Sequence, residues 1–340
     1  MGRVAWHWKR AFERRRYEFI HIGTKEVGPL RHPGLFPFAA YKAYKRIGRA
    51  ASVLLVHEPA SGVFAKRRPT VVFSHGVERR GWQLSLNGNP TSNKIRWRTR
   101  LLFPIWRLRQ CDIGLSKGAG LLLINSQDSE FVQREYGRRR EDIYVFKNGI
   151  HPSTLDERTQ PVDTITALFL GSWLERKGVD TLIEAARILD STGRRINWLL
   201  AGTGVDREGV LGSWPESLRS RVKVVPRFAP DAEEELLARS NLFVLPSFFE
   251  GQPLSLLQAM ASGRCCITTD CCGQRDLIRH NENGVLHQPG DARGLASLIE
   301  QCASSEALRR SLGRNAKQTV EGRSWEQVAS EVVDFVESRL

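Results

Sequence analysis

The chain has 340 residues, of which 41% are hydrophobic and 26% charged, so it can form two ordinary globular domains with separate cores. Its formal net charge of +14 favours an anionic partner, such as a phosphorylated small molecule, an acidic membrane surface or a nucleic acid. No apolar run approaches the ~20 residues that span a bilayer, and the amino terminus lacks a signal-peptide pattern, so the sequence predicts a cytoplasmic protein.

The first half of the chain alternates helices with strands. Residues 4–19 place Val4, Trp8 and Phe12 on one stripe of a predicted helix, and residues 19–23 (FIHIG) are predicted to be a strand. Further strands are expected in the stretches SVLLVHEP, PTVVFSHG, GLLLIN and DIYVF, and a helix follows the third of them.

From Thr166 the alternation starts again, with strands in ALFLGS, INWLLAG, VKVVPRF, LFVLPS and RCCITTD and helices between most of them. Buried strands alternating with helices indicate parallel sheets covered on both faces. Two such series predict an α/β protein of two doubly wound, Rossmann-like domains facing a cleft, with ligands beyond the carboxyl ends of the strands.

The strand ends of the second series carry the candidate site. Glycine lets a backbone approach a ligand, helix N-termini offer unpaired N–H groups, and cations complete a phosphate site. After Pro253, which suits a first helical turn, the N–H groups of Leu254 and Ser255 are expected to be free. This region therefore predicts a nucleotide diphosphate site, with these candidate residues: Gly171, Ser172, Arg176, Lys177, Gly202, Gly204, Glu250, Gly251, Leu254, Ser255 and Gln258.

Three stretches in order, GSWLERKGVDTLIEAA, LFVLPSFFEGQPLSLLQAMASG and NGVLHQPGDARGLASLI, resemble the C-terminal domain of the family 4 retaining glycosyltransferases of GT-B fold. The stretches VHEP and SHGVERRGW extend the resemblance more loosely into the first half. It implies an acceptor-side domain over residues 1–158, a nucleotide-sugar domain over residues 159–323, and a helix over residues 324–340 that crosses back to the first domain.

The resemblance implies a role for each matching residue. Lys177 would bind the donor diphosphate, and Arg176 would replace the family's partner arginine, whose place Ser172 occupies. Glu250 would contact the transferred sugar, and His75, in SHG, would lie near it.

Gln258 stands where the family has an acid that holds the ribose hydroxyls. Its oxygen is expected to accept from one hydroxyl while its amide donates to the other or to water. Gln258→Glu is therefore expected to tighten nucleotide binding about tenfold.

The family's retaining chemistry implies no protein nucleophile, because the departing phosphate helps to deprotonate the acceptor. No cofactor and no metal are expected, and the partners would be a nucleotide-sugar donor and a glycan or lipid-linked acceptor. Two alternatives remain: a catalytically degenerate GT-B protein that binds or scaffolds, and a sugar-nucleotide epimerase. Glu250 and Gln258 could also be surface residues, and His75 a structural histidine at a strand end.

One departure from the family concerns the start of the sheet. The family begins with a strand and a glycine-rich loop, whereas this sequence starts at the helix that should follow them. The sequence therefore predicts that the first strand of the N-terminal domain is missing, with either coding sequence upstream or a gap in the sheet that leaves its neighbours unpaired.

Two other features have alternative interpretations. Four cysteines fall within residues 265–272, but adjacent thiols in an extended segment point to opposite faces, so buried reduced thiols are favoured over zinc. The segment NKIRWRTRLLFPIWRLR mixes five arginines and a lysine with large apolar residues. It predicts either peripheral contact with an anionic membrane, at the inner face of the cytoplasmic membrane, or a packing helix. Nucleic-acid binding is disfavoured because no recognised module accompanies the charge.

Overall fold

The computed structural model describes residues 2–47, 50–65, 69–86, 95–155 and 164–340. The chain divides into two compact units, one formed by residues 1–149 with 324–340 and the other by residues 150–323. The boundary predicted between residues 158 and 159 lies in the segment 156–163, outside the described residues.

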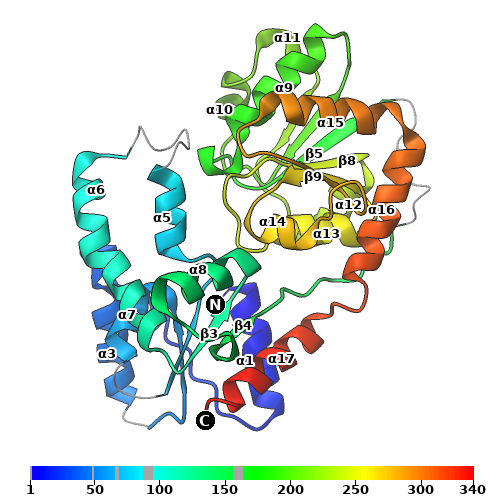
Figure 1. The fold of residues 1–340 in the computed structure, drawn as a ribbon. Coiled ribbons are helices and arrows are strands. Elements are labelled where there is room, and N and C mark those ends of the chain that lie inside the picture. The colour runs from blue at the N-terminus through cyan, green and yellow to red at the C-terminus, as the bar shows by residue number, and fades with distance from the viewer. Residues whose placement is uncertain (1, 48–49, 66–68, 87–94, 156–163) are drawn as a thin grey trace. The chain divides into compact units, whose positions relative to one another are not determined.

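In the described part of the first unit, four parallel strands form a sheet in the order β1-β2-β3-β4 (Figure 1). Its elements are α1 (Arg3–Arg14), α2 (Thr24–Val27), η1 (Pro33–Leu35), α3 (Phe36–Ile47), β1 (Leu54–His57), η2 (Glu58–Ala60), α4 (Ser61–Phe64), β2 (Thr70–Phe73), α5 (Glu78–Leu86), α6 (Trp97–Phe103), η4 (Pro104–Leu108), α7 (Arg109–Lys117), β3 (Gly120–Leu123), α8 (Ser126–Tyr136), η5 (Arg140–Asp142), β4 (Ile143–Val145) and α17 (Trp325–Glu337).

Successive side chains of this sheet point to opposite faces and pack into two separate hydrophobic cores. Val71 and Leu122 pack with Trp8 of α1 and Val332 of α17. Their neighbours in the strands point the other way, where Leu121 and other residues pack with α7 and α8. The period of two along each strand therefore places helices on both faces.

The predicted strand at residues 19–23 is wrong, because this segment has no regular secondary structure. Phe19 packs against Phe12 of α1, with 5.7 Å between ring centroids, while Ile20 is exposed, so the segment adds to the helix side instead of extending the sheet. The expected gap is also absent among the described strands. Each neighbouring pair from β1 to β4 is hydrogen-bonded, and β1 and β4 are the edge strands of this described sheet.

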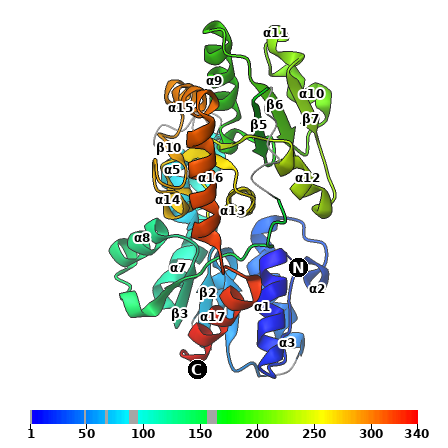
Figure 2. The ribbon, with the colours of Figure 1, turned by 90° about the vertical axis from the view of Figure 1, so that its right-hand side faces the viewer.

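The C-terminal helix α17 belongs to the first unit and lies along α1 (Figures 1 and 2). The Ser324 hydroxyl caps it by accepting from the Gln327 N–H. Arg15, the residue just after α1, forms ion pairs with Asp334 and Glu337 of α17, at 2.5 and 2.6 Å between nitrogen and oxygen. Buried apolar side chains of both helices complete the contact.

The second unit holds six described parallel strands in the order β10-β9-β8-β5-β6-β7. Its elements are β5 (Thr166–Leu170), η7 (Glu175–Lys177), α9 (Val179–Ser191), β6 (Asn197–Ala201), α10 (Arg207–Gly212), α11 (Glu216–Arg219), β7 (Val222–Val225), η8 (Pro230–Ala232), α12 (Glu233–Ala238), β8 (Leu242–Leu245), α13 (Leu254–Ala261), β9 (Cys265–Thr269), α14 (Cys272–Leu277), β10 (Val285–His287), α15 (Ala292–Ser304) and α16 (Glu306–Val320).

The strand order of this sheet reverses between β5 and β8, which are hydrogen-bonded neighbours although the strands β6 and β7 lie between them in the sequence. At such a switch point the connections after the two strands lead to helices on opposite faces, and ligands of open α/β sheets bind there, outside the carboxyl ends of the strands. Helices α9 and α15 lie together on one face of the sheet, and α13 and α16 lie on the other (Figure 1).

None of the helices in the described ranges is both long and apolar enough to cross a membrane.

Candidate functional site in the second unit

The loops after β5 and β8 lie directly against each other at the switch point. Gly178, which starts α9, has a φ of +72°, and a Cβ there would sit 1.9 Å from the Pro246 carbonyl oxygen. Only glycine suits both the left-handed backbone and this close approach. The Phe248 N–H donates to the Arg176 carbonyl at 2.9 Å, which joins the two loops a second time.

This junction brings Lys177 and Glu250 together. The Lys177 ammonium nitrogen is 2.5 Å from Glu250 Oε1, and Arg176 Nη1 is 3.7 Å from the same oxygen. The Lys177 and Glu250 side chains are nearly buried, whereas the Arg176 side chain is 51% exposed. The site therefore holds one fixed cation and one that can reorient, both next to a single carboxylate.

The glycines predicted for the site differ in their geometry. Gly202 and Gly204 both have a φ of +68°, which disfavours any residue with a side chain. A Cβ at Gly171 would be in ordinary contact, at 3.8 Å, with the side chains of Lys177 and Phe169, so this loop lies next to the lysine. Ser172 follows at once and is exposed.

A polar network supports the loop that carries Glu250. The buried Gln274 amide donates to the hydroxyls of Thr268 and Thr269, each at 2.7 Å, and the Thr269 hydroxyl donates to the Ser247 carbonyl at 2.6 Å. A Cβ at Gly273 would sit 1.7 Å from the Gly251 carbonyl oxygen, so α14 begins in direct contact with the loop. Gln274 and Gly273 were missed by the sequence analysis, although a polar cluster after a buried strand is a usable signal.

The thiols at this strand end are structural in their contacts. The Cys271 thiol donates to the carbonyls of Ser247 and Phe248, at 3.6 and 3.5 Å. Its hydrogen bond with Cys272, together with burial, raises the pKa of the Cys271 thiol. Across the ranges that the structure describes, no group of three or more His, Cys, Asp or Glu side chains is placed to hold a metal ion.

Helix α13 starts at Leu254, and no side chain caps its N-terminus. The N–H groups of Leu254 and Ser255 therefore have no capping acceptor, and both residues are half-buried. One turn further, Gln258 Nε2 donates to the His151 carbonyl oxygen at 3.1 Å. The role predicted for this amide, donation to a ribose hydroxyl or to water, stays a prediction, and the contact with His151 is one that the sequence did not indicate.

The first and last residues of the second unit, where the chain enters from the first unit and returns to it, lie next to residues 252–258. Arg323 Nη2 donates to Gln252 Oε1 at 2.6 Å, and the Ile150 N–H donates to the Arg323 carbonyl at 2.9 Å. Gln258 also contacts His151. Residues 252–258 are therefore hydrogen-bonded both to the start and to the end of the second unit.

Residues 154–319 match the family described as Glycosyl transferases group 1. The chain therefore carries a glycosyl transferases group 1 domain and has the GT-B fold. The matched region contains the whole Lys177–Glu250 junction and the loops around it.

Curated relatives agree with this assignment. The amylovoran biosynthesis glycosyltransferase AmsK of Erwinia amylovora is 32% identical over 178 residues, which cover 49% of this chain and 43% of that protein. The putative glycosyltransferase EpsD of Bacillus subtilis is 27% identical over 343 residues, covering 91% of this chain and 84% of that protein. Apart from EpsD, this chain spans about half the length of the relatives it matches.

Solved structures agree on the fold. WaaG, a glycosyltransferase involved in lipopolysaccharide biosynthesis, has a TM-score of 0.76 at 18% identity, covering 98% of this chain and 95% of that one. Anabaena HepE, crystallised with UDP and glucose, has a TM-score of 0.68 at 16% identity, covering 99% of this chain and 96% of that one.

In the first unit, His75 lies on the loop after β2. Its ring is 6.5 Å from that of Trp8 and 5.8 Å from that of His57. Neighbouring groups displace water from the imidazole, which lowers the pKa of His75. The sequence analysis left His57 unassigned, and the structure places it beside His75.

A buried carboxylate holds the His75 loop. Glu58 Oε2 is 2.5 Å from the Ser74 hydroxyl, and Glu58 Oε1 accepts from the Glu78 N–H at 3.0 Å. Burial raises the pKa of Glu58 to about 8, although both hydrogen bonds oppose the shift. The Val77 N–H donates to a second buried carboxylate, that of Asp128, at 3.0 Å. Glu58 was missed because a lone acid after a strand resembles an ordinary turn residue.

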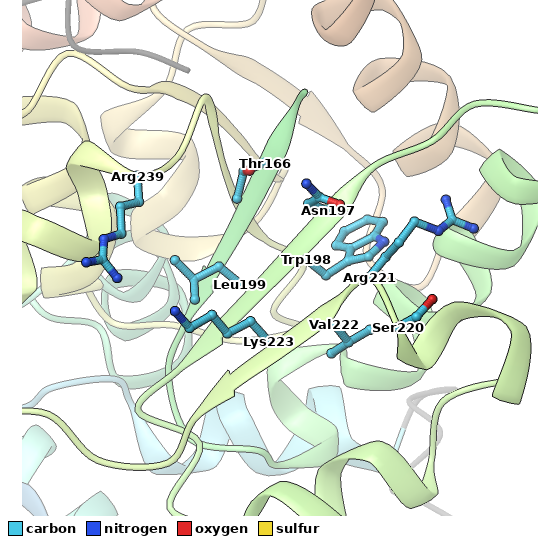
Figure 3. A pocket seen from close by; sticks show the side chains of 9 residues that line it. All are labelled: Thr166, Asn197, Trp198, Leu199, Ser220, Arg221, Val222, Lys223 and Arg239. Carbon is cyan, nitrogen blue, oxygen red and sulfur yellow. The ribbon is translucent and has the colours of Figure 1, made fainter. Parts of the chain in front are cut away.

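The second unit has a recess of about 340 Å³ near the amino ends of β5, β6 and β7 (Figure 3). Figure 3 labels its lining residues, which include Thr166 and Asn197, the first residues of β5 and β6. Ligands of open α/β sheets bind at the carboxyl ends of strands, so this recess is at the wrong end for the donor.

Proposed function

We propose that this protein transfers a sugar from a nucleotide-diphosphate donor to a glycan, lipid or other acceptor, with retention of anomeric configuration and without a metal ion. The observation that carries the proposal is the contact between Lys177 and Glu250 at the switch point of a glycosyl transferases group 1 domain. HepE, a protein of the same fold, was crystallised with UDP and glucose, which supports a nucleotide-sugar donor.

In this proposal Lys177 stabilises the diphosphate as negative charge builds up on it. A fixed ammonium in a partly closed site needs no reorganisation during the reaction, which is the main way that such sites lower a barrier. Glu250 orients the sugar, and the N–H groups at the start of α13 add hydrogen bonds to the phosphates. The acceptor oxygen attacks the anomeric carbon on the face that the diphosphate is leaving, and the departing phosphate oxygen takes the acceptor proton. The protein therefore supplies no nucleophile.

Arg176 supports an active enzyme rather than a degenerate one. Ser172 replaces the arginine that the resemblance predicts, but Arg176 places a guanidinium 3.7 Å from Glu250 Oε1. Half of its side chain is exposed, so it can turn toward a diphosphate and restore the second cation. The degenerate alternative predicts nucleotide binding without turnover, and the epimerase alternative predicts a changed sugar nucleotide without any acceptor.

The test uses the full chain with a panel of UDP-, GDP- and ADP-sugars. Binding is measured by calorimetry, and donor hydrolysis and transfer to candidate acceptors are followed by chromatography with and without EDTA. The proposal expects one donor to bind and turn over in EDTA, with the product keeping the donor's anomeric configuration. Inversion, a requirement for metal, or binding without any turnover would each contradict it.

A lipid-linked acceptor would present its sugar at a membrane surface. The peripheral contact with an anionic membrane at the cytoplasmic face, predicted from the sequence, suits such an acceptor.

A further inference from the structure

Helix α6 and the π-helical segment η4 present a row of large apolar side chains to solvent. Pro104 begins η4, and because proline lacks an N–H the helical ladder is interrupted there and widens. The row, which we call the α6–η4 face, consists of Trp97 (69% exposed), Leu101 (58%), Leu102 (51%), Ile105 (54%) and Trp106 (55%). A contiguous exposed apolar group of this kind marks an interaction surface.

The opposite side of the same helices is anchored to the unit. Phe103 stacks on Trp82 of α5 with 4.8 Å between ring centroids, and Leu108 is fully buried. Arg107 forms an ion pair with Glu78 at 2.6 Å. The α6–η4 face is therefore held outward by contacts on its back, and its exposure is a consequence of how the helices are fixed.

The charged residues of the segment that carries this face are all basic. Residues 93–111 contain no aspartate or glutamate. Arg98, whose guanidinium carbon is 5.4 Å from the Trp97 ring centroid, and Arg109 are both exposed, and neither forms an ion pair with a described residue. Arginine beside exposed tryptophan and leucine gives a surface that is both cationic and apolar.

We propose that the α6–η4 face binds an anionic lipid bilayer, with α6 and η4 lying in the interface. Tryptophan rings favour the headgroup level, the leucine and isoleucine side chains enter the acyl boundary, and the arginines contact lipid phosphates. A second copy of the chain fits less well, because a symmetric contact would place Arg98 and Arg109 of both copies together. The proposal does not depend on the transferase activity, since lipid binding is measured without a donor.

The experiment measures cosedimentation of the full chain with vesicles of equal parts phosphatidylglycerol and phosphatidylcholine, and with pure phosphatidylcholine. The wild type is expected to bind the anionic vesicles, and binding should weaken as salt is raised. Trp97→Ser with Trp106→Ser should lower the partition coefficient about tenfold or more. Arg98→Glu with Arg109→Glu should lower it by about fivefold or more for each arginine, only on anionic vesicles.

Two control variants match these changes elsewhere on the molecule. Arg195→Glu with Arg293→Glu alters two exposed arginines of the second unit, so it lowers the formal net charge from +14 to +10, as the Arg98 and Arg109 pair does. Trp6→Ser with Ile20→Ser removes exposed apolar side chains elsewhere in the first unit. Circular dichroism confirms that all variants fold.

The proposal is overturned if the wild type does not sediment with anionic vesicles, or if the control variants lose binding as much as the α6–η4 variants do. It is also overturned if light scattering shows a dimer that dissociates on Trp97→Ser with Trp106→Ser, because the face would then be a subunit interface.

Discussion

Gln258 Nε2 donates a hydrogen bond to the His151 carbonyl, with 3.1 Å between nitrogen and oxygen. Gln258 lies on α13, and His151 lies at the start of the second unit, where the chain arrives from the first. A carboxylate cannot donate, so only an amide makes this contact at position 258. The departure from the family's acid is therefore used in the structure, as a tie between α13 and the entering chain.

This tie changes what Gln258→Glu should do. A glutamate gains a charge-assisted bond to a ribose hydroxyl but loses the bond to His151, which is worth about 1 kcal/mol, and sets a carboxylate against a carbonyl. We expect nucleoside diphosphate affinity to stay within about threefold of the wild type, instead of rising tenfold, and the free energy of unfolding to fall by about 1 kcal/mol. Calorimetry and urea denaturation measure the two quantities.

Gln301→Glu, on the exposed side of α15, is the matched control for the added charge. If Gln258→Glu binds nucleotide tenfold more tightly and unfolds with wild-type stability, the contact with His151 contributes nothing and the original ribose interpretation stands.

Glu58 should give the first unit a pH-dependent stability. Its pKa rises from an ordinary value of 4.5 to about 8 on folding, because burial disfavours the charged carboxylate. Between these values the folded state keeps a proton that the unfolded state releases, so raising the pH favours unfolding. We expect this group to lower the free energy of unfolding by on the order of 1 kcal/mol per pH unit in that window. Glu58→Gln should remove that slope in denaturation curves measured from pH 4.5 to 8.

The other group that could cause such a slope is Asp128, the second buried acid that holds the His75 loop. Burial raises the pKa of Asp128 too, but its ion pair with Arg80 opposes the shift. If the slope between pH 4.5 and 8 is the same with and without Glu58, the titrating group lies elsewhere.

Strands and loops of the second unit could be predicted because their signals are local. Buried apolar runs and glycines at strand ends indicate a parallel sheet, and Lys177 and Glu250 stand at fixed places in two stretches that resemble a family. The tie of Gln258 to His151 could not be predicted, because it depends on where the chain enters the unit, 107 residues earlier in sequence. Residues 19–23 alternate like a strand, but the contact of Phe19 with Phe12 decides their place.

The buried cysteines provide a test of the metal-free proposal. Cys265 and Cys266 are fully buried in β9, and burial raises the pKa of the Cys266 thiol, which disfavours the thiolate that zinc requires. Cys265→Ala with Cys266→Ala should lower the free energy of unfolding by about 2 kcal/mol through lost packing and leave turnover in EDTA unchanged. Cys111→Ala, in the first unit, is the control for loss of one buried thiol. Zinc at a stoichiometric amount in the purified protein would contradict this prediction.

Glu250→Gln should separate binding from turnover. Removing the carboxylate charge leaves Lys177 without its partner, so affinity for the free nucleoside diphosphate should stay the same or rise slightly. The transfer rate should fall by about tenfold or more, because the sugar loses the group that orients it. Calorimetry with the nucleoside diphosphate and turnover with its sugar conjugate give the two numbers. An unchanged turnover would place Glu250 outside the reaction and leave it a structural partner of Lys177.

Lys177→Ala should weaken nucleotide binding, unlike Glu250→Gln. Without the ammonium group, nucleoside diphosphate affinity should fall by about tenfold or more, since the one nearly buried cation beside Glu250 is gone. The free energy of unfolding should also fall, by about 1–3 kcal/mol, because the nearly buried Glu250 carboxylate keeps only Arg176, at 3.7 Å.

The double variant Lys177→Ala with Glu250→Gln removes the unpaired carboxylate charge. Urea denaturation should then show that most of the lost stability is recovered, while nucleotide binding stays weak. If the double variant is as unstable as Lys177→Ala alone, the stability loss comes from packing of the lysine side chain. If Lys177→Ala binds the nucleoside diphosphate with wild-type affinity, Lys177 does not hold the donor.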